Sequence, residues 1–386
     1  MKKKILGFFT LFLFTFSTVS AQETVKVMFY NLLNYPLENA VPNRINDLAY
    51  ILNDYKPDLF LVCELNNISG AIDVFNTTKT AIHSNFEMAT YVSNTSDDTF
   101  GDQNDLQNLL YYDSTKFSLQ EEIIVPTYLR DFNVYRLQLN TIDQATNPIE
   151  LYVIVCHLKA SSGTANAQKR FEMVLDLETY LDTLPADTNV LLGGDFNVFS
   201  QSTRTQTGMG GTTGGFDDRF DFILTSEDMM SSANLTYVPE SYRVYGNNGL
   251  TSCWNKAINS SECETTGSQF SYTLRNHLHN FSDHLPVTLS LETDATFLSV
   301  EDFDISSRTI SLETTIINHS LIVNVNTSTL QNERLNIYNS LGQPVKTMQM
   351  NADAKQYFNV SDLENGLYFL SVTPINANPL KFIISN

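Results

Sequence analysis

Short apolar runs that each end in a polar side chain are the feature that most restricts how this chain can fold. Three of them read LFLVCEL over residues 59–65, LYVIVCHL over 151–158 and NVLLGGDFNV over 189–198. Runs of this length and composition are typical of strands buried in a sheet. A carboxylate at the end of a buried strand is costly unless it is paired or binds a cation. We therefore expect a sheet whose strand ends hold polar chemistry at a water-accessible edge.

The pattern around these runs predicts more strands and a few helices between Thr24 and Leu291. Apolar residues at helical spacing predict helices over residues 43–55 and 165–184. Residues 200–216, rich in Gly, Thr and Ser, are expected to form a mobile loop. Further strands are expected at 25–34, 109–113, 117–125, 133–142, 220–226 and 285–292. Strands mixed with helices in this way indicate an α/β sandwich.

The two ends of the chain differ in character from this central region. Residues 1–21 combine Lys2–Lys4, an apolar run and a small-residue end at Ala21, which is typical of a cleavable signal peptide. An uncleaved anchor is the alternative, although the run is short for a membrane span. We expect a catalytic domain over 22–292, an acidic linker over 293–306 and a small all-β module over 307–386.

The four cysteines fall into two pairs with different surroundings. Cys63 and Cys156 lie inside apolar strand-like runs and are expected to be core thiols. Cys253 and Cys263 lie in a polar loop, and export to an oxidising compartment makes a disulfide between them plausible.

The charge of the chain limits its partners. The formal net charge is −20, and removal of residues 1–21 with their three Lys and no acids gives −20 − 3 = −23. Such an acidic protein repels polyanions at long range, which argues against tight, non-specific binding of nucleic acid. Hydrolysis of a phosphodiester remains compatible with this charge because a bound metal ion reverses the field locally.

The polar residues that interrupt strand ends suggest a metal-dependent site. Mg²⁺ prefers hard oxygen ligands and needs only one or two carboxylates because it keeps several waters. Hydrolysis of a phosphodiester then needs a positioned water, a base or acid, and donors that stabilise charge on the phosphoryl oxygens. The candidates are Asn31, Glu64, His157, Asp195, Asn197, Asp221, Asp283 and His284.

Five segments that contain most of these residues resemble, in the same order along the chain, motifs of the endonuclease/exonuclease/phosphatase superfamily. They read FYNLLN, PDLFLVCEL, VCHLKA, GGDFN and SDHLPV, and the resemblance covers about residues 24–291. It implies a four-layered α/β/β/α sandwich, in which two mixed β-sheets are flanked by helices. It also implies hydrolysis of phosphoric esters with Mg²⁺, or alternatively Mn²⁺ or Ca²⁺.

The resemblance also implies roles for individual residues. Asn31, Glu64 and Asp283 match metal-binding positions, and Asp195 matches the residue that activates or orients the attacking water. The remaining matches are catalytic or contact substrate: Asn197 holds the phosphate, His157 and His284 contact the phosphoryl group, Asp221 orients His284, and Lys159 is a further substrate-binding candidate.

One family position has no clear counterpart. Many members carry a Tyr or Glu just before the strand that here reads LLYYD, where Asp105, Gln107 and Asn108 are the candidates. Lys169, Arg170 and Arg204 could contact substrate but fit solvated surface charges better. His277 and His279 are expected in a loop before the SDH motif, where they could line the mouth of the cleft.

The C-terminal residues resemble a second family. IYNSLGQ and NGLYF, within residues 305–386, are similar to the C-terminal sorting domain of type IX secretion in Bacteroidetes. The resemblance implies handling by the type IX secretion machinery and release or surface attachment. A small β-sandwich that binds a ligand or partner is the alternative.

These observations favour a secreted or cell-surface, monomeric phosphodiesterase without stable membrane insertion. An extracellular nuclease is the first expectation, with a phosphodiester as its substrate and nucleic acid as the first candidate among phosphodiesters. A phospholipid, sphingomyelin or other phosphoester hydrolase of the same superfamily is one alternative. A non-catalytic secreted binding protein is another, against which the retained site residues count.

Overall fold

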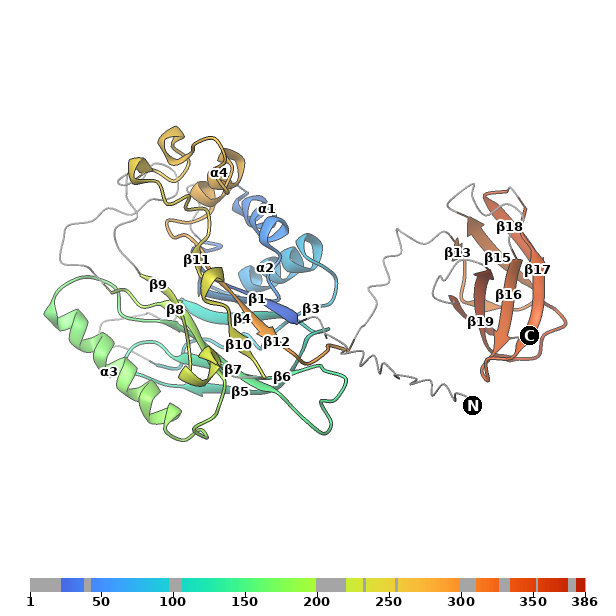
Figure 1. The fold of residues 1–386 in the computed structure, drawn as a ribbon, viewed down its shortest axis with the longest axis horizontal. Helices are drawn as coiled ribbons and strands as arrows, with labels where there is room; N and C mark the ends of the chain where they lie inside the picture. The colour runs from blue at the N-terminus through green and yellow to red at the C-terminus, as the bar shows by residue number, and fades with distance from the viewer. Residues whose placement is uncertain are drawn as a thin grey trace, which may run out of the picture. The chain divides into compact units, whose positions relative to one another are not determined.

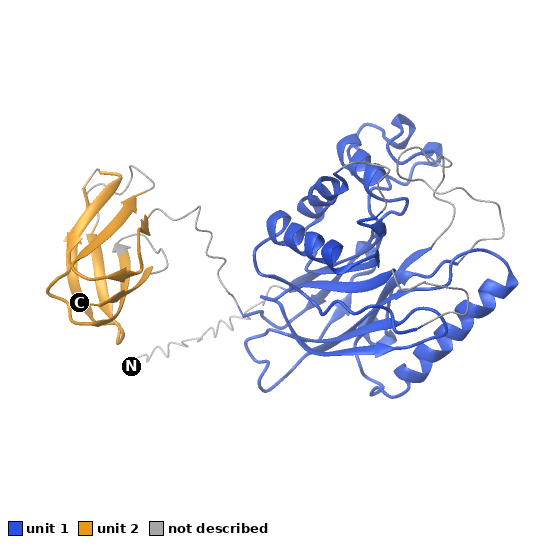
Figure 2. Cartoon of the chain, turned by 180° about the vertical axis from the view of Figure 1, so that it is seen from behind, with its two compact units in different colours: residues 1–299 blue, residues 300–386 orange. Residues whose placement is uncertain are grey.

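The structure is a computed structural model that describes most of the chain in two compact units, residues 1–299 and 300–386 (Figure 2). The predicted signal peptide and the predicted loop over 200–216 lie outside the described residues. The described ranges are 22–37, 43–96, 106–198, 220–231, 234–253, 256–298, 310–325, 334–351, 353–373 and 380–385.

The first unit contains two β-sheets. The first sheet has the order β10-β12-β1-β2-β4-β3, with β11 also paired to β12, and the second has the order β5-β6-β7-β8-β9. Both are mixed, because β1 runs parallel to β2 and β7 runs parallel to β8, while the other recorded pairs are antiparallel. The strands of the first sheet are β1 (Glu23–Tyr35), β2 (Leu59–Leu65), β3 (Phe86–Met88), β4 (Gln107–Asp113), β10 (Thr236–Tyr237), β11 (Arg243–Val244) and β12 (Val287–Thr293). Those of the second are β5 (Phe117–Val125), β6 (Phe132–Leu139), β7 (Glu150–His157), β8 (Val190–Asp195) and β9 (Asp221–Thr225).

Helices cover the outer face of each sheet (Figure 1). The first sheet is covered by α1 (Arg44–Tyr55), α2 (Ile68–Ala81) and α4 (Tyr272–Phe281), and the second by α3 (Thr164–Leu181). The core between the sheets continues under α1, α2 and α4. A separate apolar cluster lies under α3, which contributes Met173 and Leu177 to it. The predicted α/β/β/α sandwich is thereby confirmed.

The glycine pair before Asp195 is explained by close packing at β8. A Cβ on Gly193 would lie 2.7 Å from Leu61 Cδ2 on the facing sheet, and a Cβ on Gly194 would lie 2.1 Å from Cys156 Sγ on β7. Only a residue without a side chain fits where the backbone is approached this closely. The pair therefore lets β8 carry its last residue, Asp195, into the space between the sheets.

Two helices of the first unit were not predicted. α2 contains Gly, Ile, Val and Thr, which are poor helix formers, but Asn67 caps it by accepting a hydrogen bond from Gly70 N. α4 corrects the expectation that His277 and His279 lie in a loop. Ser271 caps α4 by accepting from Leu274 N, and the helix buries Leu274 with other residues at helical spacing.

The disulfide expected between Cys253 and Cys263 is present, and Cys63 and Cys156 are buried free thiols. Four short 3₁₀ helices complete the first unit: η1 (Glu227–Met230), η2 (Pro239–Ser241), η3 (Thr251–Cys253) and η4 (Ser261–Cys263).

The residues just after β12 pack against the rest of the first unit. Phe297 is buried, forms an isolated bridge with Thr141 and contacts the ring of Phe117. Leu298 N donates to Asn140 O at 2.7 Å. A linker would therefore begin later than residue 293, because Phe297 belongs to the core.

The second unit consists of strands in two sheets around its own core. The sheets have the orders β13-β15-β18 and β14-β20-β19-β16-β17. The strands are β13 (Ile310–Leu312), β14 (Ile316–Ile317), β15 (Ser320–Val325), β16 (Arg334–Asn339), β17 (Pro344–Gln349), β18 (Lys355–Asn359), β19 (Gly366–Thr373) and β20 (Leu380–Ile384). The expected small all-β module is confirmed.

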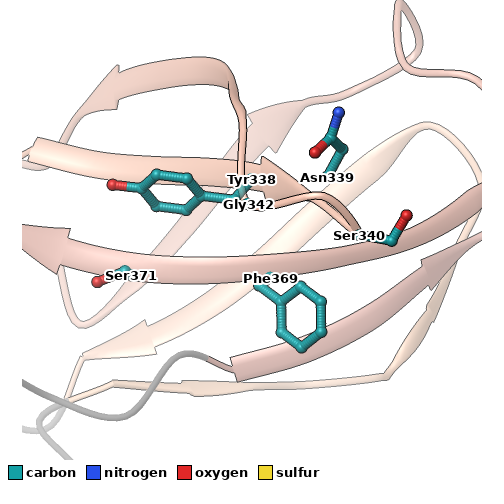
Figure 3. Close-up of a pocket in the computed structure, with 6 residues that line it drawn as sticks. All are labelled: Tyr338, Asn339, Ser340, Gly342, Phe369 and Ser371. Carbon is teal, nitrogen blue, oxygen red and sulfur yellow. The ribbon is translucent and has the colours of Figure 1, made fainter.

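A hollow of about 400 Å³ opens on this second unit (Figure 3). Tyr338 and Phe369, opposite each other on β16 and β19, line it with residues of the β16–β17 turn. Apart from Ser371, its lining comes from the same IYNSLGQ and NGLYF segments that carry the resemblance to a sorting domain.

Within the ranges that the structure describes, no helix is long and apolar enough to cross a membrane.

Candidate active site

The second sheet brings three of the predicted residues side by side. In the parallel pair β7–β8, His157 is opposite Asp195, and in the antiparallel pair β8–β9, Asp195 is opposite Asp221. Each residue ends or begins its strand at the same edge. This register explains how residues far apart in sequence meet.

Asp195 is at the centre of the cluster and is buried. Its Oδ2 accepts a hydrogen bond from Asn31 Nδ2 at 3.1 Å, and its Oδ1 accepts from the backbone N of Asn197 at 2.9 Å. Burial raises the pKa of Asp195 to about 6, and the charge of Asp221 adds to the rise. The Nε2 atoms of His157 and His284 lie 3.7 and 3.8 Å from Oδ2.

His284 is oriented by Asp221. Its Nδ1 lies 2.7 Å from Asp221 Oδ2, which leaves Nε2 directed towards Asp195 and Asp283. Burial by itself lowers the pKa of His284, but the charge and hydrogen bond of Asp221, with the charges of the other two carboxylates, raise it well above 6.5. This environment favours the charged, imidazolium form of His284.

His157 has the opposite character. Burial, followed by the positive charges of Arg130, His284 and Lys159, lowers the pKa of His157 well below 6.5. Its Nε2 faces Glu64 Oε1 at 3.8 Å as well as Asp195, and its buried Nδ1 has no hydrogen-bond partner among the described residues. The pKa values of the two histidines beside this carboxylate are therefore shifted in opposite directions.

Glu64 and Asn31 meet from neighbouring parallel strands of the first sheet. Asn31 Nδ2 donates to Glu64 Oε1 at 2.9 Å, and the backbone N of Asn34 donates to Oε2 at 3.0 Å. Glu64 has a φ of 61° and Asn197 a φ of 49°, in the left-handed region that non-glycine residues rarely adopt. Strained backbone of this kind often marks functional sites, where the surrounding structure maintains it.

The donor set fits a hard divalent cation. Two groups have their ligand atoms within 4.8 Å of one another: Glu64, His157 and Asp195, and Asp195, Asp221 and His284. Burial raises the pKa of Glu64, and the charges of Asp195 and Asp283 raise it further. Oδ1 of Asp283 is buried without a hydrogen-bond partner in the described part of the chain. Crowded carboxylates and an orphaned oxygen are what a bound cation would relieve.

The structure assembles the predicted metal residues to different degrees. Asn31 and Glu64 are in direct contact, whereas Asp283 belongs to neither cluster and is recorded 3.9 Å from His284 Nε2. Asn197 donates through Nδ2 to Leu158 O at 3.2 Å, which fixes it beside His157.

Basic residues border the His157 side of the cluster. Lys159 follows β7 and helps to lower the pKa of His157, while its Nζ donates to Ala160 O. Arg170 on α3 donates to the carbonyls of Lys159 and Ser161. Burial lowers the pKa of Arg170, and the charge of Asp195 opposes this shift. Lys169 lies over the ring of Tyr128, and Arg204 lies outside the described residues.

Among the described residues, none stands out as a counterpart of the unmatched family position. Asp105 lies outside the described residues, and Gln107 Oε1 accepts from Asn94 N. Asn108 Nδ2 donates to Asp131 O, Asn133 Oδ1 and Val155 O, so that it links β4 to β6 and β7.

Sequence reasoning missed Arg130 at the base of the site. Arg130 is buried, and its Nη1 donates to Leu158 O at 3.1 Å. It lowers the pKa of His157 and supports the backbone that follows it. In the sequence it stands in the polar segment YLRDF, which resembles an exposed turn.

His277 and His279 lie on α4. His277 Nδ1 contacts Asp47 Oδ1 at 2.6 Å and its ring stacks on Tyr50, so it joins α4 to α1. Burial lowers the pKa of His279.

Comparison with known proteins identifies the family. The family model described as "Endonuclease/Exonuclease/phosphatase family" matches residues 28–284, and the one described as "Secretion system C-terminal sorting domain" matches residues 318–386. This chain belongs to the endonuclease/exonuclease/phosphatase family and is a phosphoric ester hydrolase. Its sorting domain implies secretion to the cell surface or the medium.

Solved structures with similar folds share little sequence with this chain. A humanized TDP2 of D. rerio is 13% identical over 69% of this chain and 98% of its own, with a TM-score of 0.44. The catalytic domain of human Nocturnin with a bound sulfate anion is 16% identical over 70% and 97%, with a TM-score of 0.41. A family member from Bacteroides thetaiotaomicron is 13% identical over 71% and 96%, with a TM-score of 0.42. No curated protein matches the chain.

Proposed function

We propose that this chain is a secreted, Mg²⁺-dependent phosphodiesterase and that nucleic acid is its substrate. The observation that carries the proposal is the buried Asp195, which lies 3.7 Å from His157 and 3.8 Å from His284 beside the Asn31–Glu64 pair. The surroundings favour a neutral His157 and a charged His284. This arrangement provides a base, a cationic donor and metal ligands within one cluster.

Each residue has a distinct part in the proposed reaction. Asp195, ionised above about pH 6, accepts a proton from the attacking water or orients it. His284, held charged by Asp221, donates to a phosphoryl oxygen, and Asn197 and His157 hold the phosphate. Asn31, Glu64 and Asp283 would hold Mg²⁺, which stabilises the negative charge that develops on the phosphoryl group.

Two basic residues near the site support nucleic acid as the substrate, although the protein as a whole is acidic. Lys159 and Arg170 lie at the rim next to His157 and Asp195. Such cations can contact the phosphates that neighbour the scissile one. The net charge of −20 favours short or single strands over long duplex DNA.

Turnover assays with several substrates and metals test this proposal. We expect the purified chain to hydrolyse bis-p-nitrophenyl phosphate and DNA or RNA with Mg²⁺ or Mn²⁺, and to lose activity in EDTA. Asp195→Ala and His284→Ala should each lower kcat at least about 100-fold, as when a principal acid–base or charge-stabilising group is removed.

Three outcomes would contradict parts of the proposal. Turnover that is insensitive to EDTA would remove the metal dependence. Hydrolysis of sphingomyelin without hydrolysis of DNA or RNA would replace the nuclease by a lipid hydrolase. Near-normal activity of both variants would overturn the site assignment.

A further inference from the structure

The pairing of β1 with β12 ends before either strand reaches the active site. Their register runs from Glu23 opposite Thr293 to Phe29 opposite Val287. Asn31 lies two residues beyond this point on β1, and the Asp283–His284 pair precedes β12. The recorded ladder between the two strands therefore leaves these site residues beyond its last pair.

Ser282 forms one connection across this gap. Its Oγ donates to Asn31 O at 2.8 Å and accepts from the backbone N of His284 at 3.1 Å. Ser282 is 2% exposed and Asn31 is fully buried, so both bonds lie away from water. A single hydroxyl thus joins the backbone of Asn31 to that of His284.

Arg44, the first residue of α1, forms a second connection. It is 4% exposed, and its Nη1 donates to Leu33 O at 3.1 Å while its Nη2 donates to Leu32 O at 2.5 Å. Its Nε donates to Phe281 O at 2.9 Å. One guanidinium therefore holds the backbone after Asn31 and the backbone before Ser282, segments that are far apart in sequence.

Aromatic rings fix the position of this guanidinium. The Arg44 Cζ atom lies 4.9 Å from the ring centroid of Phe281 and 5.6 Å from that of Tyr35. A buried charge is costly unless it is fully hydrogen-bonded, and the planar fork of Arg suits several carbonyls at once. Lys has no such fork and cannot reproduce the arrangement.

We propose that Arg44 is a positioning residue for hydrolysis, which with Ser282 fixes the Asn31 segment relative to the Asp283–His284 segment. The inference rests on the proposed function for the roles of those residues. Asn31 contacts both Glu64 and Asp195, and His284 Nε2 lies 3.8 Å from Asp195. A shift between the two segments would therefore separate His284 from Asp195, and Asp283 from the Asn31–Glu64 pair.

Arg275 offers a matched control. It is fully buried on α4, and it too binds backbone carbonyls, those of Phe270, Ile258 and Ser260. It also pairs with Glu264, and none of these partners belongs to the Asp195 cluster. Loss of Arg275 should lower stability as loss of Arg44 does, without moving the two site segments.

The test compares Arg44→Met, Arg44→Lys and Arg275→Met in the full chain. The readouts are kcat and KM for bis-p-nitrophenyl phosphate, Mn²⁺ affinity by calorimetry, and Tm by circular dichroism. We expect both Arg44 variants to lose about 10- to 100-fold in kcat, with little change in KM, because misplaced catalytic groups affect the transition state most. Their Mn²⁺ affinity should fall about 10-fold, as for lost outer support of a metal site. Arg275→Met should keep kcat and Mn²⁺ affinity within about 2-fold of the wild-type values, although its Tm falls.

The outcomes separate this inference from the proposed function. A folded Arg44→Met with normal kcat and Mn²⁺ affinity overturns it, as does an equal loss in Arg275→Met. If Arg44→Met does not fold, Ser282→Ala provides the same test with a smaller change: normal kcat and Mn²⁺ affinity there also overturn it. A wild-type chain that turns over no substrate contradicts the proposed function, while the Mn²⁺ affinities of the variants still decide the role of Arg44.

Discussion

The pair of Asp221 and His284 determines how the activity should depend on pH. Asp221 supplies the largest contributions that raise the pKa of His284, by its charge and by its 2.7 Å hydrogen bond. A cationic His284 is present below its pKa and is lost as the pH rises through it. We therefore expect the alkaline limb of the pH–rate profile to report His284, and an acidic limb near pH 6 to report ionisation of Asp195.

Asp221→Asn should move the alkaline limb to lower pH, because the pKa of His284 falls when its anionic partner is removed. The pH dependence of kcat/KM in a metal-saturated buffer series measures this shift. Asp113→Asn is the matched control, since Asp113 Oδ2 lies 3.1 Å from His83 Nε2 at the opposite end of β4 from the site. An unchanged alkaline limb in Asp221→Asn, or an equal shift in Asp113→Asn, would show that another group controls it.

At the residue scale, the polar residues that end strands could be predicted from the sequence as site residues. The burial of two arginines near the site could not. Glu64, His157 and Asp195 each interrupt an apolar run, so their unusual position is visible in one dimension. Arg130 and Arg44 stand in polar segments, YLRDF and NRIND, where a cation resembles a surface charge. Their burial depends on carbonyls of distant segments, that of Leu158 just after β7 and that of Phe281 at the end of α4, which the local sequence does not encode.

At the scale of elements, β8 is the strand on which the site depends most. Gly194→Ala would place a Cβ 2.1 Å from Cys156 Sγ and 2.6 Å from Cys156 O. The backbone oxygen cannot move without disturbing the β7–β8 pairing that sets His157 beside Asp195. We expect a loss of about 1–3 kcal/mol in the free energy of unfolding, typical of overpacking, together with reduced kcat.

Chemical denaturation and turnover of the same sample measure both effects. Gly163→Ala is a useful control, because its Cβ would meet no atom within 4 Å, although its φ of 98° carries its own strain. It should lose stability through that backbone strain but retain kcat. A Gly194→Ala protein with normal stability and kcat would show that β7 and β8 are not so closely packed.

The longer strands, α1 and α3 could be predicted from their apolar runs and periodicity, whereas α2, α4 and the short strands β3, β10 and β11 could not. α2 depends on tertiary support, including the hydrogen bond from Tyr111 Oη to Ala71 O, rather than on helix propensity. α4 did carry a signal, since Ser271 precedes Leu274 and Leu278 at helical spacing. The polar residues Asn276, His277, His279 and Asn280 conceal that signal, because they give the segment before the SDH motif the composition of a loop.

At the scale of the whole molecule, the two units have separate apolar cores. The described core clusters of the first unit contain residues up to Phe297, and that of the second begins at Ile310. A chain with two separate cores generally unfolds as two units, and each can fold without the other. We therefore expect residues 22–299 to retain kcat within about 2-fold, since the proposed site lies entirely in the first unit.

The exact end of this truncation should matter because of Phe297. Its ring contacts Phe117, Lys116 lies over it, and Ile142 N and Leu298 N form backbone hydrogen bonds that close the same segment onto residues 140–142. A chain ending at residue 292 loses this buried ring and should be about 3–5 kcal/mol less stable than one ending at 299, as for removal of a core Phe. Urea unfolding of the two truncated chains measures the difference. Phe297→Ala in the longer chain should reproduce most of it, whereas equal stability of the two chains would place the end of the catalytic unit before Phe297.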